Sequence, residues 1–201
     1  MAKKSIICLC LCLAASGVFA ETGDFGQDGK KGLTPQQLAA LEAGKVIFSA
    51  KDKFAGEKNA LIEAAIIFDK SPEEVFSILY HTEDQVKYLE KIKNIKIVKK
   101  ENAEDNLEFL LKVAWVDIVY RAKHYFDKDK HYIHWELDKS FKNDLNDLKG
   151  FWDLYPYGDG KTLVRYGSNV SIKNVPSFIE SMFKKNGVKK SLETVRAWVN
   201  K

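Results

Sequence analysis

Cysteine is nearly absent from this chain, and its placement excludes several kinds of chemistry. The three cysteines among the 201 residues are Cys8, Cys10 and Cys12, all close to the N-terminus. They lie in a segment with the features of an export signal, so the folded protein is expected to contain none. Disulfide bonds, a cysteine nucleophile and cysteine-ligated metal sites are therefore excluded. Each cysteine follows a large apolar residue, whereas lipoprotein processing needs a small one, so no lipid anchor is expected.

Long hydrophobic runs are also missing. The N-terminal run, residues 6–15, is shorter than the roughly 20 residues that a membrane-spanning helix needs. Two lysines precede it, and Val18-Phe19-Ala20 places small residues where a signal peptidase cuts. We therefore expect residues 1–20 to be a signal peptide that is removed after Ala20, and we expect the protein to reach the periplasm.

Neither sign of charge dominates the sequence. Lysine and arginine number 32 against 28 acidic residues, a formal charge of +4, and loss of the two leader lysines leaves +2. This balance gives no argument for nucleic acid as a partner. Lysines gather between residues 87 and 100, but acidic residues are interspersed, which favours a solvated face. A transient contact with anionic lipid head groups stays open.

Histidine is scarce as well, and its spacing argues against a metal site. His131 and His134 are three residues apart, which on a strand places them on opposite faces. No third ligand lies near them in the sequence, so we expect neither a metal nor another cofactor.

Two segments in the first half of the chain carry strong helix-start signals. Thr34-Pro35 opens a predicted helix over residues 35–43, and Ser71-Pro72-Glu73-Glu74 forms a capping box for another. A second short helix is expected over residues 83–90. Glycine and charge dominate residues 21–32, which we interpret as a flexible linker, leaving residues 33–201 as the folded domain.

The middle of the chain alternates apolar and polar residues with the period of a strand. After two earlier strands at residues 45–50 and 59–68, strands are predicted at residues 95–100, 107–115, 118–127, 132–137, 148–155 and 162–171. Gly158-Asp159-Gly160 is typical of a hairpin turn. Short connections of this kind predict an antiparallel meander.

The last stretch, residues 176–199, predicts one long amphipathic helix that begins at Pro176. The apolar face of the strands needs a cover, and this helix provides it, so the fold class is α+β. Gly187 interrupts the apolar stripe and leaves space where a side chain would otherwise fill the core.

Three motifs, in this order and spacing, carry a resemblance. They are FDKSPEEVF at residues 68–76, LKGFWDLYP at residues 148–156, and GKTLVRY at residues 160–166, followed by Val175-Pro176 before the last helix. With them the chain resembles the START-like, or helix-grip, superfamily, nearest its coenzyme Q-binding and polyketide cyclase/dehydrase branches. The resemblance implies a curved antiparallel sheet wrapped around the C-terminal helix, with two short helices after the first main strand and a cavity between sheet and helix.

The candidate ligand-binding residues are those that alternation and helical spacing place on the inward faces. They are Trp115, Tyr120, His124, Trp135, Trp152 and Tyr166 on the strands, with Met182 and Phe183 on the helix. A filled aromatic core and a ligand cavity both fit this set. The resemblance favours the cavity.

Two functions follow from that resemblance. Members of the superfamily bind lipids, isoprenoids, quinones, polyketides or hormones, and some are enzymes, but no catalytic residue is common to all. An enzyme of the cyclase/dehydratase kind would use His124 or a cavity tyrosine to move protons. The inward faces offer one histidine, tyrosines and Ser168 but no carboxylate, which favours an exported carrier of a hydrophobic small molecule.

Overall fold

An eight-stranded antiparallel sheet forms most of the molecule in the computed structural model, which describes residues 23–49, 61–172, 179 and 183–201. Its strand order is β1-β2-β8-β7-β6-β5-β4-β3. The strands are β1 (Ile47–Phe48), β2 (Ile62–Phe68), β3 (Ile92–Lys100), β4 (Glu104–Val113), β5 (Val116–Asp127), β6 (Tyr132–Leu137), β7 (Leu145–Tyr157) and β8 (Lys161–Ile172). The predicted signal peptide and Met182 lie outside the described residues.

The helices begin where the sequence signals them. Helix α1 (Pro35–Glu42) and helix α2 (Pro72–Tyr80) both start with complete capping boxes, at Thr34 and Ser71. Each cap satisfies two backbone N–H groups that the first helical turn leaves without partners. The second short helix after β2 is a 3-10 helix, η1 (Thr82–Lys87), shorter than predicted.

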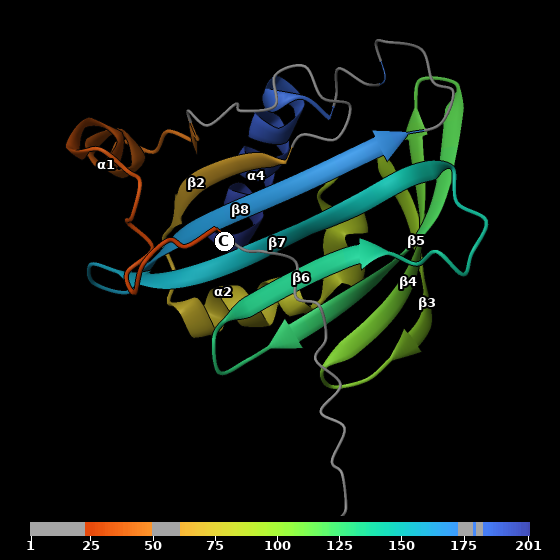
Figure 1. The fold of residues 1–201 in the computed structure, drawn as a ribbon, viewed down its shortest axis with the longest axis horizontal. Coiled ribbons are helices and arrows are strands. Elements are labelled where there is room, and N and C mark those ends of the chain that lie inside the picture. The colour runs from red at the N-terminus through yellow and green to blue at the C-terminus, as the bar shows by residue number, and fades with distance from the viewer. Residues whose placement is uncertain (1–22, 50–60, 173–178, 180–182) are drawn as a thin grey trace, which may run out of the picture.

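The sheet is strongly curved, and α2 and α4 (Lys185–Val199) lie on its inner side while α1 lies outside it (Figure 1). Apolar residues of α4 join one hydrophobic cluster with residues of α2, β2 and β8. The members from α4 are Val188, Leu192, Val195 and Val199. The predicted α+β fold, with a curved antiparallel sheet and a C-terminal helix, is confirmed.

The last helix is shorter than expected. Phe183 lies in a turn and Lys184 has an extended backbone, so the helix starts at Lys185 instead of running unbroken from residue 176. Asn186 and Gly187 are weak helix formers, and no side chain caps this end. Ile179 is fully buried against the part of the sheet made by β4 and β5.

The segment from residue 23 to 32 is packed on the outer face of the sheet and is not a free linker. Phe25 is only 5% exposed, and the Arg165 guanidinium stacks over its ring at 4.0 Å. The Arg165 side chain also donates a hydrogen bond of 3.2 Å to the Gly29 carbonyl oxygen. The prediction of a flexible linker is therefore wrong for these residues, because one buried aromatic ring and one buried cation anchor them.

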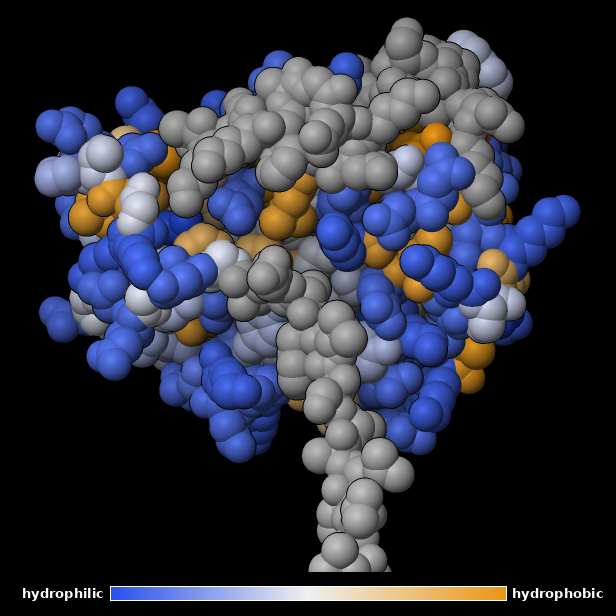
Figure 2. Space-filling model, in the orientation of Figure 1, coloured by the Kyte–Doolittle hydropathy of each residue, from blue (hydrophilic) through white to orange (hydrophobic). Residues whose placement is uncertain are grey.

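The outer face seen in Figure 2 is mostly hydrophilic, with apolar side chains in small separate areas. In the part of the chain that the structure describes, no helix is long and apolar enough to cross a membrane.

Candidate functional site

Aromatic side chains from four neighbouring strands form the floor of a site on the inner face of the sheet. His124 of β5 is the register partner of Trp135 on β6, and Trp152 of β7 is the partner of Tyr166 on β8. The Trp152 and Tyr166 ring centroids are 4.6 Å apart, and those of Trp135 and Trp152 are 6.2 Å apart. Alternation along antiparallel strands thus brings rings from distant sequence positions into one continuous layer.

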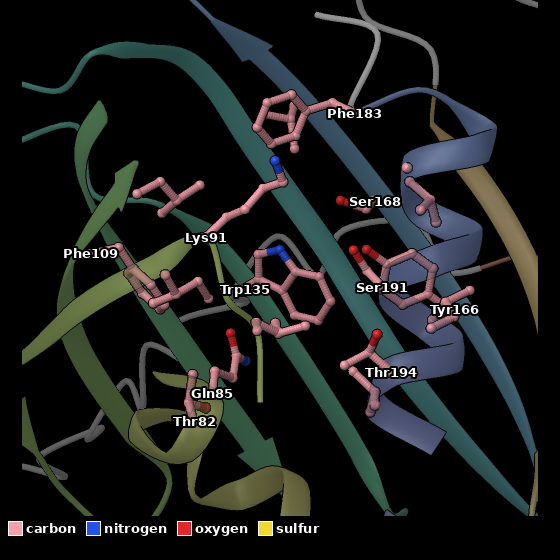
Figure 3. Close-up of a pocket in the computed structure, with 18 of the residues that line it drawn as sticks. Thr82, Gln85, Lys91, Phe109, Trp135, Tyr166, Ser168, Phe183, Ser191 and Thr194 are labelled. Atoms are coloured by element: carbon pink, nitrogen blue, oxygen red, sulfur yellow. The ribbon is translucent and has the colours of Figure 1, made fainter. Parts of the chain in front are cut away.

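A cavity of about 600 Å³ separates this floor from α4. Val188, Leu192 and Val195 of α4 form its opposite wall. Figure 3 shows that polar side chains are added at two places: Ser168, Ser191 and Thr194 on the side of β8 and α4, and Thr82 and Gln85 on η1. Ligand pockets typically span 300–1,000 Å³ and combine apolar walls with a few placed polar groups. The interior of this fold is therefore a cavity and not a filled aromatic core.

Gly150 makes the floor possible. It is the register partner of Trp135, and a Cβ atom at this position would lie 2.3 Å from the Trp135 Cζ2 atom and 2.5 Å from the Gly167 carbonyl oxygen. Only glycine leaves the indole ring room to lie against β7.

Six of the eight predicted site residues line the cavity: Tyr120, His124, Trp135, Trp152, Tyr166 and Phe183. Their role in ligand binding remains a prediction. Trp115 does not belong to the site, since it lies in the turn between β4 and β5 and is 77% exposed. Alternation ends at Val113, because the two-residue turn redirects the chain, and Ala114 has a positive φ of 55°.

Sequence reasoning missed two polar side chains at the edge of the aliphatic α4 wall. Ser191 and Thr194 flank the apolar stripe that was expected to face a core, so they were not considered. Their spacing of three residues on one helix face was the available signal.

Sequence reasoning also missed a carboxylate. Asp105, in β4, is fully buried on the inner face, and its Oδ1 atom lies 3.2 Å from Nδ1 of His124. The expectation that the inward faces carry no carboxylate is therefore wrong. The alternation of Leu107 and Phe109, continued two residues back, was the signal for it.

The cavity tyrosines are neutral at physiological pH. Burial raises the pKa of the Tyr120 phenol, and burial likewise raises that of Tyr166. Neither phenol therefore serves as a phenolate, and both offer O–H groups. No cluster of three or more potential metal ligands occurs among the described residues.

Lys91 lines the cavity just before β3, and Figure 3 shows its side chain extending towards Phe183. We expect Lys91→Gln to weaken binding of the anionic probe anilinonaphthalene sulfonate by about two- to fivefold, as for an exposed charge pair. The neutral analogue N-phenylnaphthylamine, which lacks the sulfonate, should bind unchanged. Fluorescence titrations of both probes measure the effect.

Lys93→Gln is the matched control, since Lys93 is only two residues further along the chain, in β3, but does not line the cavity. An equal loss of anionic-probe affinity in both variants would show that the lysine charge acts through the overall electrostatic potential of the protein and not by a contact in the cavity.

No family model and no curated protein matches the chain. Several solved structures match the chain. A START superfamily protein from Mycobacterium smegmatis is 16% identical, with a TM-score of 0.57 over 69% of this chain and 96% of that one. A STAR-related lipid transfer protein from Xanthomonas axonopodis is 13% identical, with a TM-score of 0.58 over 78% of this chain and 93% of that one.

The Zhui aromatase/cyclase from Streptomyces sp. R1128 is 10% identical, with a TM-score of 0.59 over 70% of this chain and 93% of that one. At sequence identities this low, a structural match is evidence for the fold alone. Together with the curved sheet, the C-terminal helix and the cavity between them, these matches show that the chain has the START-like helix-grip fold.

Proposed function

We propose that this chain is an exported binding protein that holds a hydrophobic small molecule of the lipid, isoprenoid or quinone class between sheet and α4. The observation that carries the proposal is the cavity of about 600 Å³, whose floor is aromatic and whose far wall is aliphatic. Burial of an apolar ligand there removes its surface from water, which is the main driving force for such binding. The structural neighbour from Xanthomonas, a STAR-related lipid transfer protein, supports the same class of ligand.

Export is proposed from the sequence of residues 1–20. The mass of the protein recovered from a periplasmic extract should correspond to a chain that begins at Glu21. An intact leader on cytoplasmic protein would refute export while leaving the cavity unaffected.

The ligand is sought by native mass spectrometry of protein purified from its own host, followed by organic extraction. We expect a mass increment that disappears on extraction and reappears as an apolar compound in the extract. A chain that carries no increment and takes up no N-phenylnaphthylamine would contradict the carrier function.

Ala122→Leu tests whether the space is used for binding. Ala122 is buried and lines the cavity, so a larger side chain enters existing space, and we expect a nearly unchanged unfolding midpoint. The added bulk should weaken N-phenylnaphthylamine uptake, and ligand stabilisation of the melting temperature should shrink in parallel.

Ala65→Leu is the matched control. Ala65 is buried on the outer side, packed with Leu41, Ile67 and Leu163, and it does not line the cavity. Overpacking there should reduce the free energy of unfolding by about 1–3 kcal/mol while probe affinity of the folded protein is kept. If Ala122→Leu is as destabilising as Ala65→Leu, the interior has no space to bind a ligand.

The second candidate is a cyclase/dehydratase-type enzyme in the same cavity. The observation in its favour is the Asp105–His124 pair, which places a carboxylate behind an imidazole. Chemical change of a bound polyketide-like compound during incubation, abolished by His124→Phe, would support the enzyme over the carrier.

A further inference from the structure

Asp105 is a buried carboxylate that has one ion-pair neighbour, His124, in the part of the chain that the structure describes. It is fully buried, and β4 and β5 place it directly opposite His124. Its neighbour on the other side is Lys100 of β3, but the Lys100 ammonium lies 2.5 Å from Glu83. No side chain or backbone group among the described residues completes a well-aligned hydrogen bond to either Asp105 oxygen.

The His124 ring turns its Nδ1 atom towards the Asp105 carboxylate. The Nδ1–Oδ1 separation of 3.2 Å is within reach of a hydrogen bond, although the alignment is not ideal. A carboxylate only accepts hydrogen bonds, so the proton between these atoms belongs to Nδ1. A buried carboxylate is costly without such a donor, and this cost favours the tautomer with its proton on Nδ1, the nitrogen that faces Asp105.

The other nitrogen, Nε2, lies across the ring, and His124 lines the cavity between Phe109 and Trp135. In the neutral ring with its proton on Nδ1, Nε2 can only accept a hydrogen bond, and the rings of Phe109 and Trp135 flank the imidazole in the cavity floor. A purely apolar ligand would bury this acceptor without a partner, which is unfavourable. A ligand hydroxyl would donate to it.

We propose that the Asp105–His124 pair is a recognition site for a hydroxyl group of the ligand, an alcohol or a phenol. This inference rests on the proposed binding function and narrows the ligand class. Among isoprenoids it selects alcohols over hydrocarbons, and among quinones it selects the reduced, hydroxyl-bearing form over the oxidised one. Asp105 acts as a positioning residue, since it orients the ring and keeps Nε2 as the acceptor.

Two probes of nearly equal size test the hydroxyl directly: para-octylphenol, which donates a hydrogen bond, and para-octylanisole, which does not. Each displaces N-phenylnaphthylamine at about pH 8. We expect the ratio of phenol to anisole affinity to be about tenfold larger in the unmodified protein than in His124→Phe. His134→Phe, which replaces a histidine of β6 that does not line the cavity, should leave the ratio unchanged.

The role of Asp105 has its own readout. Nitrogen NMR shifts of the His124 ring at about pH 8 should show a proton on Nδ1 and none on Nε2 in the unmodified protein. In Asp105→Asn, the amide can donate to Nδ1, so we expect the proton to move to Nε2 and the phenol preference to fall.

The outcomes of these experiments distinguish failure of the hydroxyl site from failure of the proposed binding function. If neither octyl probe nor N-phenylnaphthylamine binds, the carrier function fails and the inference fails with it. If all three bind but the affinity ratio is the same in the unmodified protein and His124→Phe, only the hydroxyl site is refuted. A proton on Nε2 in the unmodified protein would equally overturn it, and that measurement needs no variant to fold.

Discussion

Gly150→Ala is expected to remove probe binding and to lower the free energy of unfolding by about 3 kcal/mol, the upper end for overpacking. The new Cβ atom would meet the Trp135 ring at 2.3 Å and the Gly167 carbonyl oxygen at 2.5 Å. The indole packs against Trp152 and Tyr166 in the cavity floor, so a displaced ring disturbs that floor. Moving the Gly167 backbone oxygen requires β8 to shift against β7. Urea unfolding and N-phenylnaphthylamine titration measure the two effects.

Gly167→Ala separates lost stability from lost space. Its Cβ atom would lie 2.2 Å from the Phe151 ring, on the outer face of the same pair of strands. We expect this variant to be destabilised as well but to bind the probe normally when folded. If Gly150→Ala unfolds at the midpoint of the unmodified protein and binds the probe with unchanged affinity, the packing of Trp135 on Gly150 does not shape the site.

The inner faces of β4 and β5 were predictable because these strands bury alternate residues. In β4, Leu107, Phe109, Leu111 and Val113 are buried as predicted, and capping chemistry located both N-terminal helices. These signals are local: a period of two residues, or a cap and its partner three residues later. The cavity floor follows from them once the strands pair in order.

What sequence reasoning missed depends on contacts between distant segments. Asp105 is an acidic residue near a strand end, where such residues are ordinarily exposed. Its burial is explained by its contact with the His124 ring on the next strand, which the sequence of β4 does not show. Trp115 was placed inside by extending an alternation through a turn. The start of α4 was misplaced because the apolar stripe continues across Phe183, where the backbone does not stay helical.

Residues 23–32 are the clearest case of such a contact. Their glycine and charge are typical of a linker, yet the Phe25 ring packs 5.9 Å from that of Phe151 and covers Arg165. One aromatic residue in a polar segment was too weak a signal, because its binding site on β7 and β8 exists only after the sheet has formed.

Phe25→Ala is expected to lower the free energy of unfolding by about 2–3 kcal/mol, somewhat less than the loss of a ring from a central core. The cost is limited because the N-terminal segment can detach, after which Arg165 regains water and no unpaired charge stays buried. Chemical denaturation measures the stability. Hydrogen exchange should show lost protection at Lys31, whose amide donates to the Phe25 carbonyl oxygen at 3.0 Å, while β7 and β8 stay protected.

Asp28→Asn, in the same segment, provides the control, since the Asp28 side chain is exposed and its one partner among the described residues is the nearby Lys30. It should leave the unfolding midpoint and the exchange pattern unchanged.

Probe affinity should also be unchanged in Phe25→Ala, because the ring packs on the outer face and the cavity lies on the inner one. A stability equal to that of the unmodified protein would mean that residues 23–32 behave as the linker their composition suggests, and that the Arg165 contacts contribute nothing. Combined loss of stability and probe affinity would instead mean that the outer segment supports the curvature of the sheet, on which the width of the cavity depends.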